Sequence, residues 1–173
     1  MNDIGVNDIA CKAELSRSAF YFYFPSKAAA VTALLGDMYE NIFRAAPWFD
    51  DRSGNALEQL RSGIEQTATM WRSRATLMVA MLDAVDDDAD VKATWAGWLA
   101  EFEARTAARL RADQAAGLAR TDVDLETLSR ILVGVIFAAM ESDVRNVKAG
   151  RVTSPHLVST VYDVWRRSAY RET

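Results

Sequence analysis

Few residues of this sequence have the types and spacing that catalysis requires. His156 is the only histidine and Cys11 the only cysteine, and they lie near opposite ends of the chain. A nucleophilic cysteine needs a base within hydrogen-bonding distance, and no pattern predicts that these two side chains meet. The sequence also lacks a glycine-rich phosphate loop and the HExxH and CxxC motifs. We therefore predict that the protein is not an enzyme and uses no cofactor.

An acidic cluster is the one candidate for a metal site. It consists of Asp86, Asp87, Asp88 and Asp90. Carboxylates bind Ca²⁺, but this stretch lacks the central glycine and the distal glutamate of a calcium-binding loop. The simpler interpretation is a break between two helices, with negative charge at the N-terminus of the second helix, where the helix dipole favours it. No metal site is predicted.

The residues from Val6 to Lys27 have the pattern of a helix-turn-helix. A first helical pattern leads into a short polar turn, and a second begins at Ser16, whose side chain can cap a helix. Pro25 ends this second helix, because proline cannot donate a backbone hydrogen bond to it. Its polar side chains are Arg17, Ser18, Tyr21 and Tyr23. Two short helices with exposed polar groups on the second are typical of a motif that reads DNA.

The string DIACKAELSRSAFYFYFPSK resembles the DNA-binding signature of the TetR family, and FYFYFPSK with the downstream tryptophans is most similar to its EthR-like branch. The resemblance implies a transcriptional regulator, of the repressor type, which binds double-stranded operator DNA as a homodimer. It also implies that a small hydrophobic effector releases the DNA, and that the dimer forms through the last two helices. The DNA-contacting residues implied are Arg17, Ser18, Ala19 and Tyr21, with Tyr23 and Lys27 on phosphates.

The start of the sequence differs from the family pattern. TetR-family proteins have a further helix before this point, usually carrying basic residues, and that helix is absent here. Residues 1–27 have no net charge, because three basic residues balance three acidic ones: Lys12, Arg17 and Lys27 against Asp3, Asp8 and Glu14. Phosphate contacts supply most non-specific DNA affinity. Two alternatives follow: the sequence begins downstream of the first helix, or the protein is a dimeric small-molecule-binding protein without effective DNA binding.

Composition is typical of a globular protein in a reducing compartment. Half of the 173 residues are hydrophobic, which is enough for a sizeable core. A net charge of −4 argues against indiscriminate nucleic-acid binding, although it does not exclude a local basic surface. A single cysteine fits the cytoplasm. The longest apolar run, Ile131 to Met140, is about half the length of a membrane span, so no membrane association is predicted.

Hydrophobic periodicity predicts an all-α fold, because helical spacing recurs throughout and no stretch alternates with period two. We divide it into a truncated helix-turn-helix domain with a linking helix (residues 1–46) and a helical ligand-binding and dimerisation domain (residues 47–173). The stretch from Ala46 to Asn55 is predicted to be a loop. The body helices predicted are Ala56 to about Arg72, Arg74 to Val85, Val91 to Ala116, Asp124 to Lys148, and a last helix opening at Ser154-Pro155. Arg109 is placed on the solvent-exposed face of its helix.

Aromatic and methionine side chains recur on the apolar faces of these helices. Large rings and flexible thioethers often line adaptable apolar pockets, although each of them could equally be ordinary core. TetR-type bodies commonly enclose an effector pocket, so the resemblance favours the pocket. The candidate ligand-binding residues are Met70, Trp71, Met78, Met81, Trp95, Trp98, Phe102, Ile136, Phe137, Met140 and Trp165. Where EthR-like proteins place amides on the penultimate helix, this sequence has Val133 and Ile136, which predicts that apolar burial and shape hold the ligand.

Overall fold

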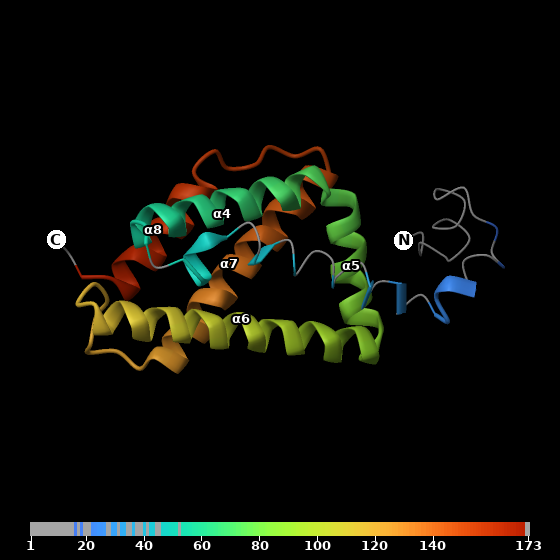
Figure 1. Ribbon diagram of the computed structural model, residues 1–173. Coiled ribbons are helices and arrows are strands. Elements are labelled where there is room, and N and C mark those ends of the chain that lie inside the picture. The colour runs from blue at the N-terminus through green and yellow to red at the C-terminus, as the bar shows by residue number, and fades with distance from the viewer. Residues whose placement is uncertain are drawn as a thin grey trace.

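The structure is a computed structural model that describes residues 16, 18, 22–26, 29–30, 32–33, 36, 40, 42–43, 46–51 and 53–171. Over these residues it is all-helical, as predicted, apart from one isolated β-bridge between Ala119 and Tyr170. The elements are η1 (Pro47–Phe49), α4 (Ala56–Ser73), α5 (Ala75–Asp87), α6 (Ala89–Ala115), α7 (Leu125–Lys148) and α8 (Leu157–Ala169) (Figure 1).

Helices α4, α6 and α7 begin at side chains that cap free backbone N–H groups. Asn55 accepts hydrogen bonds from the backbone of the first turn of α4, and Asp124 does so for α7. Asp88 accepts from Asp90 N at 2.9 Å and from Val91 N at 3.2 Å, so α6 begins two residues earlier than predicted. The acidic cluster thus lies at the break between α5 and α6, as the sequence predicted, and Asp88 in addition caps α6.

The last helix begins later than predicted. Ser154 accepts a hydrogen bond from His156 N at 3.2 Å, which closes a turn around Pro155 rather than starting the helix. The regular pattern begins with the bond from Thr160 N to His156 O, and α8 runs from Leu157. The Ser-Pro pair therefore marks a turn that precedes the helix.

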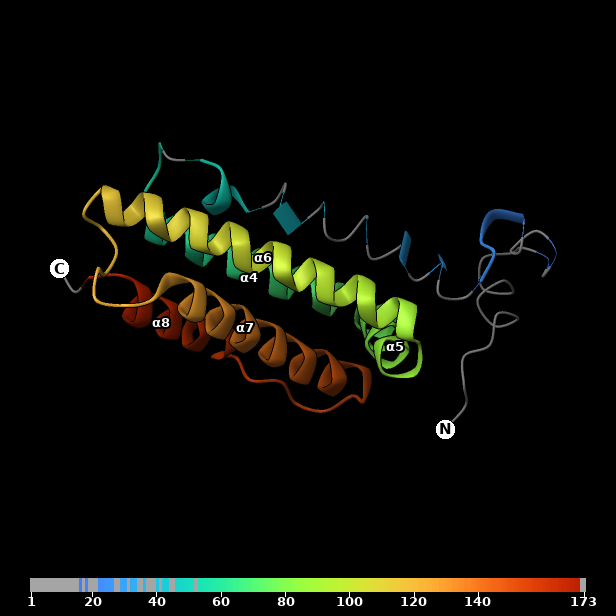
Figure 2. The ribbon, with the colours of Figure 1, turned by 90° about the horizontal axis from the view of Figure 1, so that it is seen from below.

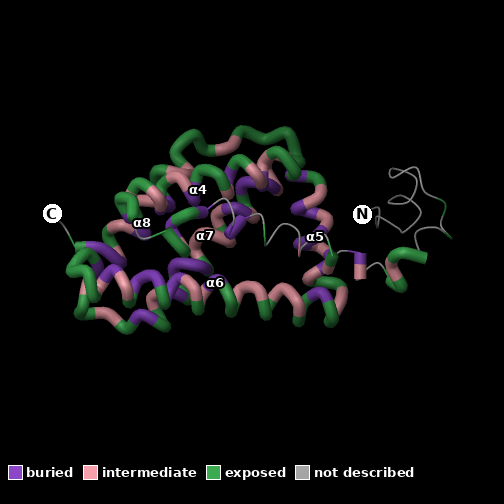
Figure 3. The backbone as a smooth tube through the Cα atoms, in the orientation of Figure 1, coloured by how far each residue is buried: buried purple, intermediate pink, exposed green. Residues whose placement is uncertain are grey.

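Helix α7 is central to the body, because it contacts α4, α5, α6 and α8. The long helices run along the body, and α5 lies across one end, where it joins α4 to α6 (Figures 1 and 2). Buried residues gather on the inner sides of these helices, whereas the loop between α7 and α8 is exposed (Figure 3). No helix in the described part of the chain has the length and apolar character needed to cross a bilayer.

A buried polar group, which we call the anchor, ties η1 to α6 and to the end of α8. It consists of Arg109, Asp113, Tyr170 and Trp48. The Nε of Arg109 donates to both carboxylate oxygens of Asp113 at 2.9 Å, and its Nη1 donates to the carbonyls of Trp48 and of Asp51. Tyr170 donates to Asp113 at 2.7 Å and accepts from the indole of Trp48 at 2.9 Å.

The position of Arg109 corrects the prediction that it faces solvent, since only 2% of this residue is exposed. A buried guanidinium is tolerated when opposite charge and hydrogen-bond acceptors surround it. Here Asp113 supplies the charge, one turn along the same helix, and the carbonyls of Trp48 and Asp51 supply two further acceptors. The anchor therefore holds the backbone just before α4 against α6.

Candidate functional site

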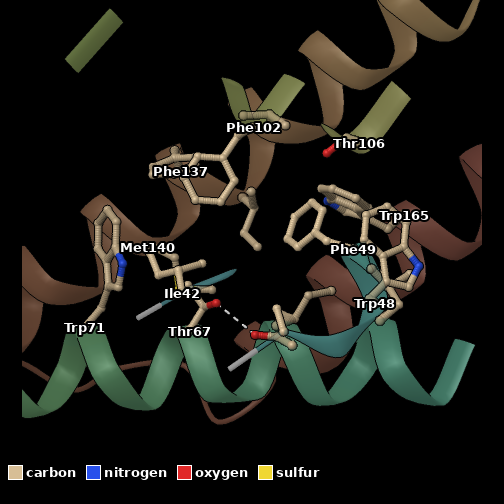
Figure 4. A pocket seen from close by; sticks show the side chains of 16 residues that line it. Ile42, Trp48, Phe49, Thr67, Trp71, Phe102, Thr106, Phe137, Met140 and Trp165 are labelled. Carbon is tan, nitrogen blue, oxygen red and sulfur yellow. Dashed lines mark hydrogen bonds between the residues drawn. The ribbon is translucent and has the colours of Figure 1, made fainter. Parts of the chain in front are cut away.

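An apolar cavity of about 50 Å³ lies between the helices of the body. Helices α4, α6, α7 and α8 form most of its wall, and the segment before α4 completes it (Figure 4). The sixteen lining residues are Ile42, Ala46, Trp48, Phe49, Leu60, Gly63, Ile64, Thr67, Trp71, Phe102, Thr106, Val133, Ile136, Phe137, Met140 and Trp165. The segment that leads from the N-terminal part of the chain into the body thus contributes four wall residues of its own.

Six of the candidate ligand-binding residues lie on this wall. They are Trp71, Phe102, Ile136, Phe137, Met140 and Trp165. Val133 lies there as well, so both apolar residues that replace the expected amides of the penultimate helix face the cavity. The structure therefore brings candidates from four separate helices around one space, and their binding of a ligand stays a prediction.

The other five candidates do not line the cavity: Met70, Met78, Met81, Trp95 and Trp98. Met78 and Met81 are each only 1% exposed and belong to the core, because they lie on α5, which packs against α6 and α7. Trp95 is half-buried and meets Phe137 edge-on, with 5.6 Å between ring centroids. Trp95 therefore packs against a wall residue without lining the cavity itself.

Sequence reasoning missed two aromatic wall residues, Trp48 and Phe49. They lie in the stretch APWFDDRSGN, whose Pro, Gly, Asp and Asn content predicted a loop. The signal that could have found them is the adjacent pair of large rings inside a polar loop, since such rings are rarely left in solvent. In the structure they form η1, and Trp48 is 2% exposed.

Aromatic rings pack against one another around the cavity. Phe43, just outside the wall, stacks on Phe102 with centroids 4.4 Å apart. Phe102 meets Phe137 at 5.3 Å, and Phe137 meets Trp71 at 5.7 Å, both edge-on. Each such pair adds about 0.5–1.5 kcal/mol beyond burial alone. The segment before η1 is therefore joined to the wall through Phe43.

The polar atoms of the wall are few and mostly lack partners. Thr67 donates its hydroxyl hydrogen bond to the carbonyl of Gly63 at 2.8 Å. The indole nitrogens of Trp71 and Trp165 and the hydroxyl of Thr106 are buried and have no hydrogen-bond partner among the described residues. No lining residue carries a charge. Chemically, this space suits a neutral, mostly apolar molecule.

Two of the candidate DNA-contacting residues are described. Ser18 and Tyr23 are both exposed, and Ser18 shares a 2.9 Å hydrogen bond with the hydroxyl of Ser16. The ring of Tyr23 meets that of Phe22 edge-on at 5.3 Å. The remaining candidates lie outside the described residues: Arg17, Ala19, Tyr21 and Lys27.

Comparison with known proteins identifies the family. Residues 60–171 match "Transcriptional regulator EthR, C-terminal domain", and residues 1–34 match "Bacterial regulatory proteins, tetR family". The HTH-type transcriptional regulator EthR of Mycolicibacterium smegmatis is 30% identical over 176 residues, covering 97% of this chain and 77% of that protein. The EthR of Mycobacterium tuberculosis is 28% identical over 180 residues, covering 98% of this chain and 79% of that protein.

A solved structure shows the same fold. It is that of a TetR transcription regulator from Haloarcula marismortui, which superimposes with a TM-score of 0.74 at 16% sequence identity. The match covers 97% of this chain and 86% of that one. With the helical body, its apolar cavity and the sequence matches at both ends, the chain belongs to the TetR family of transcriptional regulators and is EthR-like.

Proposed function

We propose that this protein is a repressor that releases its operator when a small hydrophobic effector occupies the cavity. One observation carries the proposal: the segment before α4 is part of the cavity wall, through Ile42, Ala46, Trp48 and Phe49. That segment connects the DNA-reading part of the chain to the body. An occupant of the cavity therefore touches the connection directly.

The size of the cavity supports a change of shape on binding. At about 50 Å³ it is roughly one third of an engineered cavity that admits benzene. An effector of more than a few heavy atoms must therefore displace part of the wall. Such an effector binds the displaced shape more tightly than the original one, and this difference shifts the protein towards the displaced shape. Operator affinity falls because the DNA-reading parts of the two copies in the dimer are then spaced differently.

The operator is double-stranded DNA, read by the second helix of the helix-turn-helix in the major groove. In this proposal Arg17, Ser18, Ala19 and Tyr21 contact base edges or the nearby backbone. Tyr23 and Lys27 hold phosphates, which fix the orientation of the reading helix without sequence preference. The protein works where the bacterial chromosome lies, in the cytoplasm.

Two copies form a homodimer through α7 and α8, packed as a four-helix bundle. The apolar side chains of Ile131 on α7 and Val164 on α8 support this, because they are 56% and 38% exposed in the single chain. A twofold dimer presents two reading helices to two half-sites, so a change in the spacing of the heads weakens both contacts together.

The test measures DNA binding by fluorescence anisotropy, with a duplex selected from a random library. Apolar ligands found by thermal shift should lower the affinity of the parent protein for that duplex. Ile136→Trp replaces an aliphatic side chain on the cavity wall by a large ring, which fills the space. This variant should therefore still bind the duplex, and the ligands should not change its affinity. Ala108→Trp is the matched control, because Ala108 is exposed on α6 away from the cavity. It should respond as the parent does.

Two results would contradict the proposal. One is a parent protein that binds no duplex at low salt, which would favour a ligand-binding protein without DNA affinity. The other is a ligand that raises the thermal midpoint of the parent but leaves its affinity for the duplex unchanged.

A further inference from the structure

We propose that Arg105 of α6 sets how much effector is needed to release the operator. Its guanidinium holds Phe43, in the segment before η1, in the position that belongs to the empty cavity. Removing the charge of Arg105 should therefore make the effector bind more tightly. This role rests on the proposed function of the cavity and names a residue that opposes the change of shape. Arg105 does not line the cavity, so it acts through Phe43 as a positioning residue.

Phe43 contacts the cavity wall and Arg105 at the same time. Its ring stacks on Phe102 with 4.4 Å between centroids and meets Phe49 edge-on at 4.7 Å. Phe102 and Phe49 both line the cavity, whereas Phe43 does not (Figure 4). The guanidinium carbon of Arg105 lies over the Phe43 ring, 4.1 Å from its centroid. A cation in this position is attracted by the negative face of the ring.

Arg105 is held in this position from its own helix. Its Nε donates a 2.8 Å hydrogen bond to the carboxylate of Glu101, one turn earlier on α6. Phe102 lies three residues before Arg105, and residues with this spacing are neighbours on a helix surface. The side chains of Arg105 and Glu101 are 39% and 48% exposed. Helix α6 therefore presents to Phe43 both a ring of the cavity wall and a cation at the protein surface.

The parts of the cavity wall differ in how firmly they are held. Trp48 is fixed by the anchor, because its carbonyl and its indole N–H both have buried partners. The wall at Phe102 and Phe49 is backed by Phe43, and Phe43 contacts the partly exposed Arg105. An occupant larger than the cavity therefore displaces the wall most readily towards Phe43, where the surface rather than the core lies beyond.

This displacement separates Phe43 from Arg105, so the attraction between them opposes it. The contact thus stabilises the undisplaced shape and keeps the displaced shape rare. A ligand that binds a rare shape has its apparent affinity reduced by the fraction of protein in that shape. Weakening the contact raises this fraction and tightens effector binding by the same factor. Loss of an ordinary structural contact would instead lower stability without tightening binding.

The experiment removes the charge with Arg105→Gln. Binding is measured by fluorescence titration with N-phenyl-1-naphthylamine, a neutral dye that becomes bright in apolar sites. The variant should bind the dye about two- to fivefold more tightly than the parent, the range expected for one exposed cation–π contact. The dye concentration that releases half of the selected DNA duplex should fall by a similar factor. Phe43→Leu, which removes the ring but stays apolar, should change both values in the same direction.

Arg111→Gln is the matched control. Arg111 is also an exposed residue of α6 with a carboxylate partner, Glu126 of α7, and it does not line the cavity. This variant should bind the dye as the parent does. If Arg105→Gln binds the dye no more tightly than the parent, or if Arg111→Gln tightens binding equally, the role of Arg105 is wrong, while the cavity remains an effector site. If the dye does not bind the parent, this role and the proposed function both fail.

Discussion

The phenol of Tyr170 donates a 2.7 Å hydrogen bond to the carboxylate of Asp113, which lies 57 residues earlier in the chain. The same oxygen accepts a hydrogen bond from the indole of Trp48. Burial, and next the hydrogen bond to Asp113, raise the pKa of Tyr170 well above its usual value. The phenol therefore stays protonated and remains a donor at physiological pH.

Tyr170→Phe should lower the free energy of unfolding by about 1–3 kcal/mol, because it leaves the Trp48 indole and an oxygen of Asp113 without their partner. Urea unfolding followed by circular dichroism measures this change. Tyr162→Phe, at a half-buried position of α8, is the control and should change stability much less. Equal effects of the two substitutions would show that the anchor contributes little.

The raised pKa of Tyr170 predicts that the stability of the parent protein, but not that of Tyr170→Phe, depends on this residue's ionisation at alkaline pH. Above about pH 10 the unfolded chain loses the Tyr170 proton, while the folded chain retains it because its pKa is raised. The stability from this residue is therefore fully present below pH 10 and falls by about 1.4 kcal/mol per pH unit above it. Tyr170→Phe should lack this part of the alkaline slope. Parallel stability profiles of parent and variant would contradict the assignment.

Two neighbouring residues of α7 differ in burial, so substitutions at them test the core and the proposed dimer surface separately. Leu132 is 1% exposed within the single chain, whereas Ile131 is 56% exposed. Leu132→Glu should unfold the protein, because it buries an unpaired charge. Ile131→Glu should keep the helical fold and convert the dimer to a monomer. Light scattering with circular dichroism distinguishes these results, and a folded Ile131→Glu dimer would place the interface elsewhere.

A substitution of Lys27 tests the proposed role of the helix-turn-helix in DNA binding. Lys27→Ala should weaken DNA binding about equally for all duplexes and reduce the slope of log affinity against log salt by about one unit, as expected for one lost phosphate contact. Anisotropy titrations at several salt concentrations measure both. Lys92→Ala, at an exposed position of α6, is the control and should leave the slope unchanged. A changed sequence preference in Lys27→Ala would instead assign Lys27 to base contacts.

Helix positions could be predicted because their signals are local. Asn55 and Asp124 precede α4 and α7, and each caps its helix with its own side chain. The start of α8 was predicted two residues too early, since Ser154 has the same chemistry in a turn as in a helix cap. A single sequence cannot distinguish these two uses, because the difference depends on the path of the chain before the residue.

The wall of the cavity could be predicted only in part. Met81 and Ile136 both lie on apolar faces of their helices, yet only Ile136 lines the cavity. Periodicity gives the direction of a side chain around its own helix, but not what faces it across the fold. Arg109 shows the same limit: its partners include the carbonyl of Trp48, 61 residues away, and no local pattern predicts that contact.

The anchor fixes the position of the segment before α4. Arg109 holds the carbonyls of Trp48 and Asp51, and every described residue from Ala29 to Phe43 is helical. Ile42, on the cavity wall, lies only six residues before Trp48 in the sequence. In the proposed mechanism, an occupant that displaces Ile42 therefore acts beside a fixed point of the chain, and the displacement is passed towards the DNA-reading part because the anchor holds the other side in place.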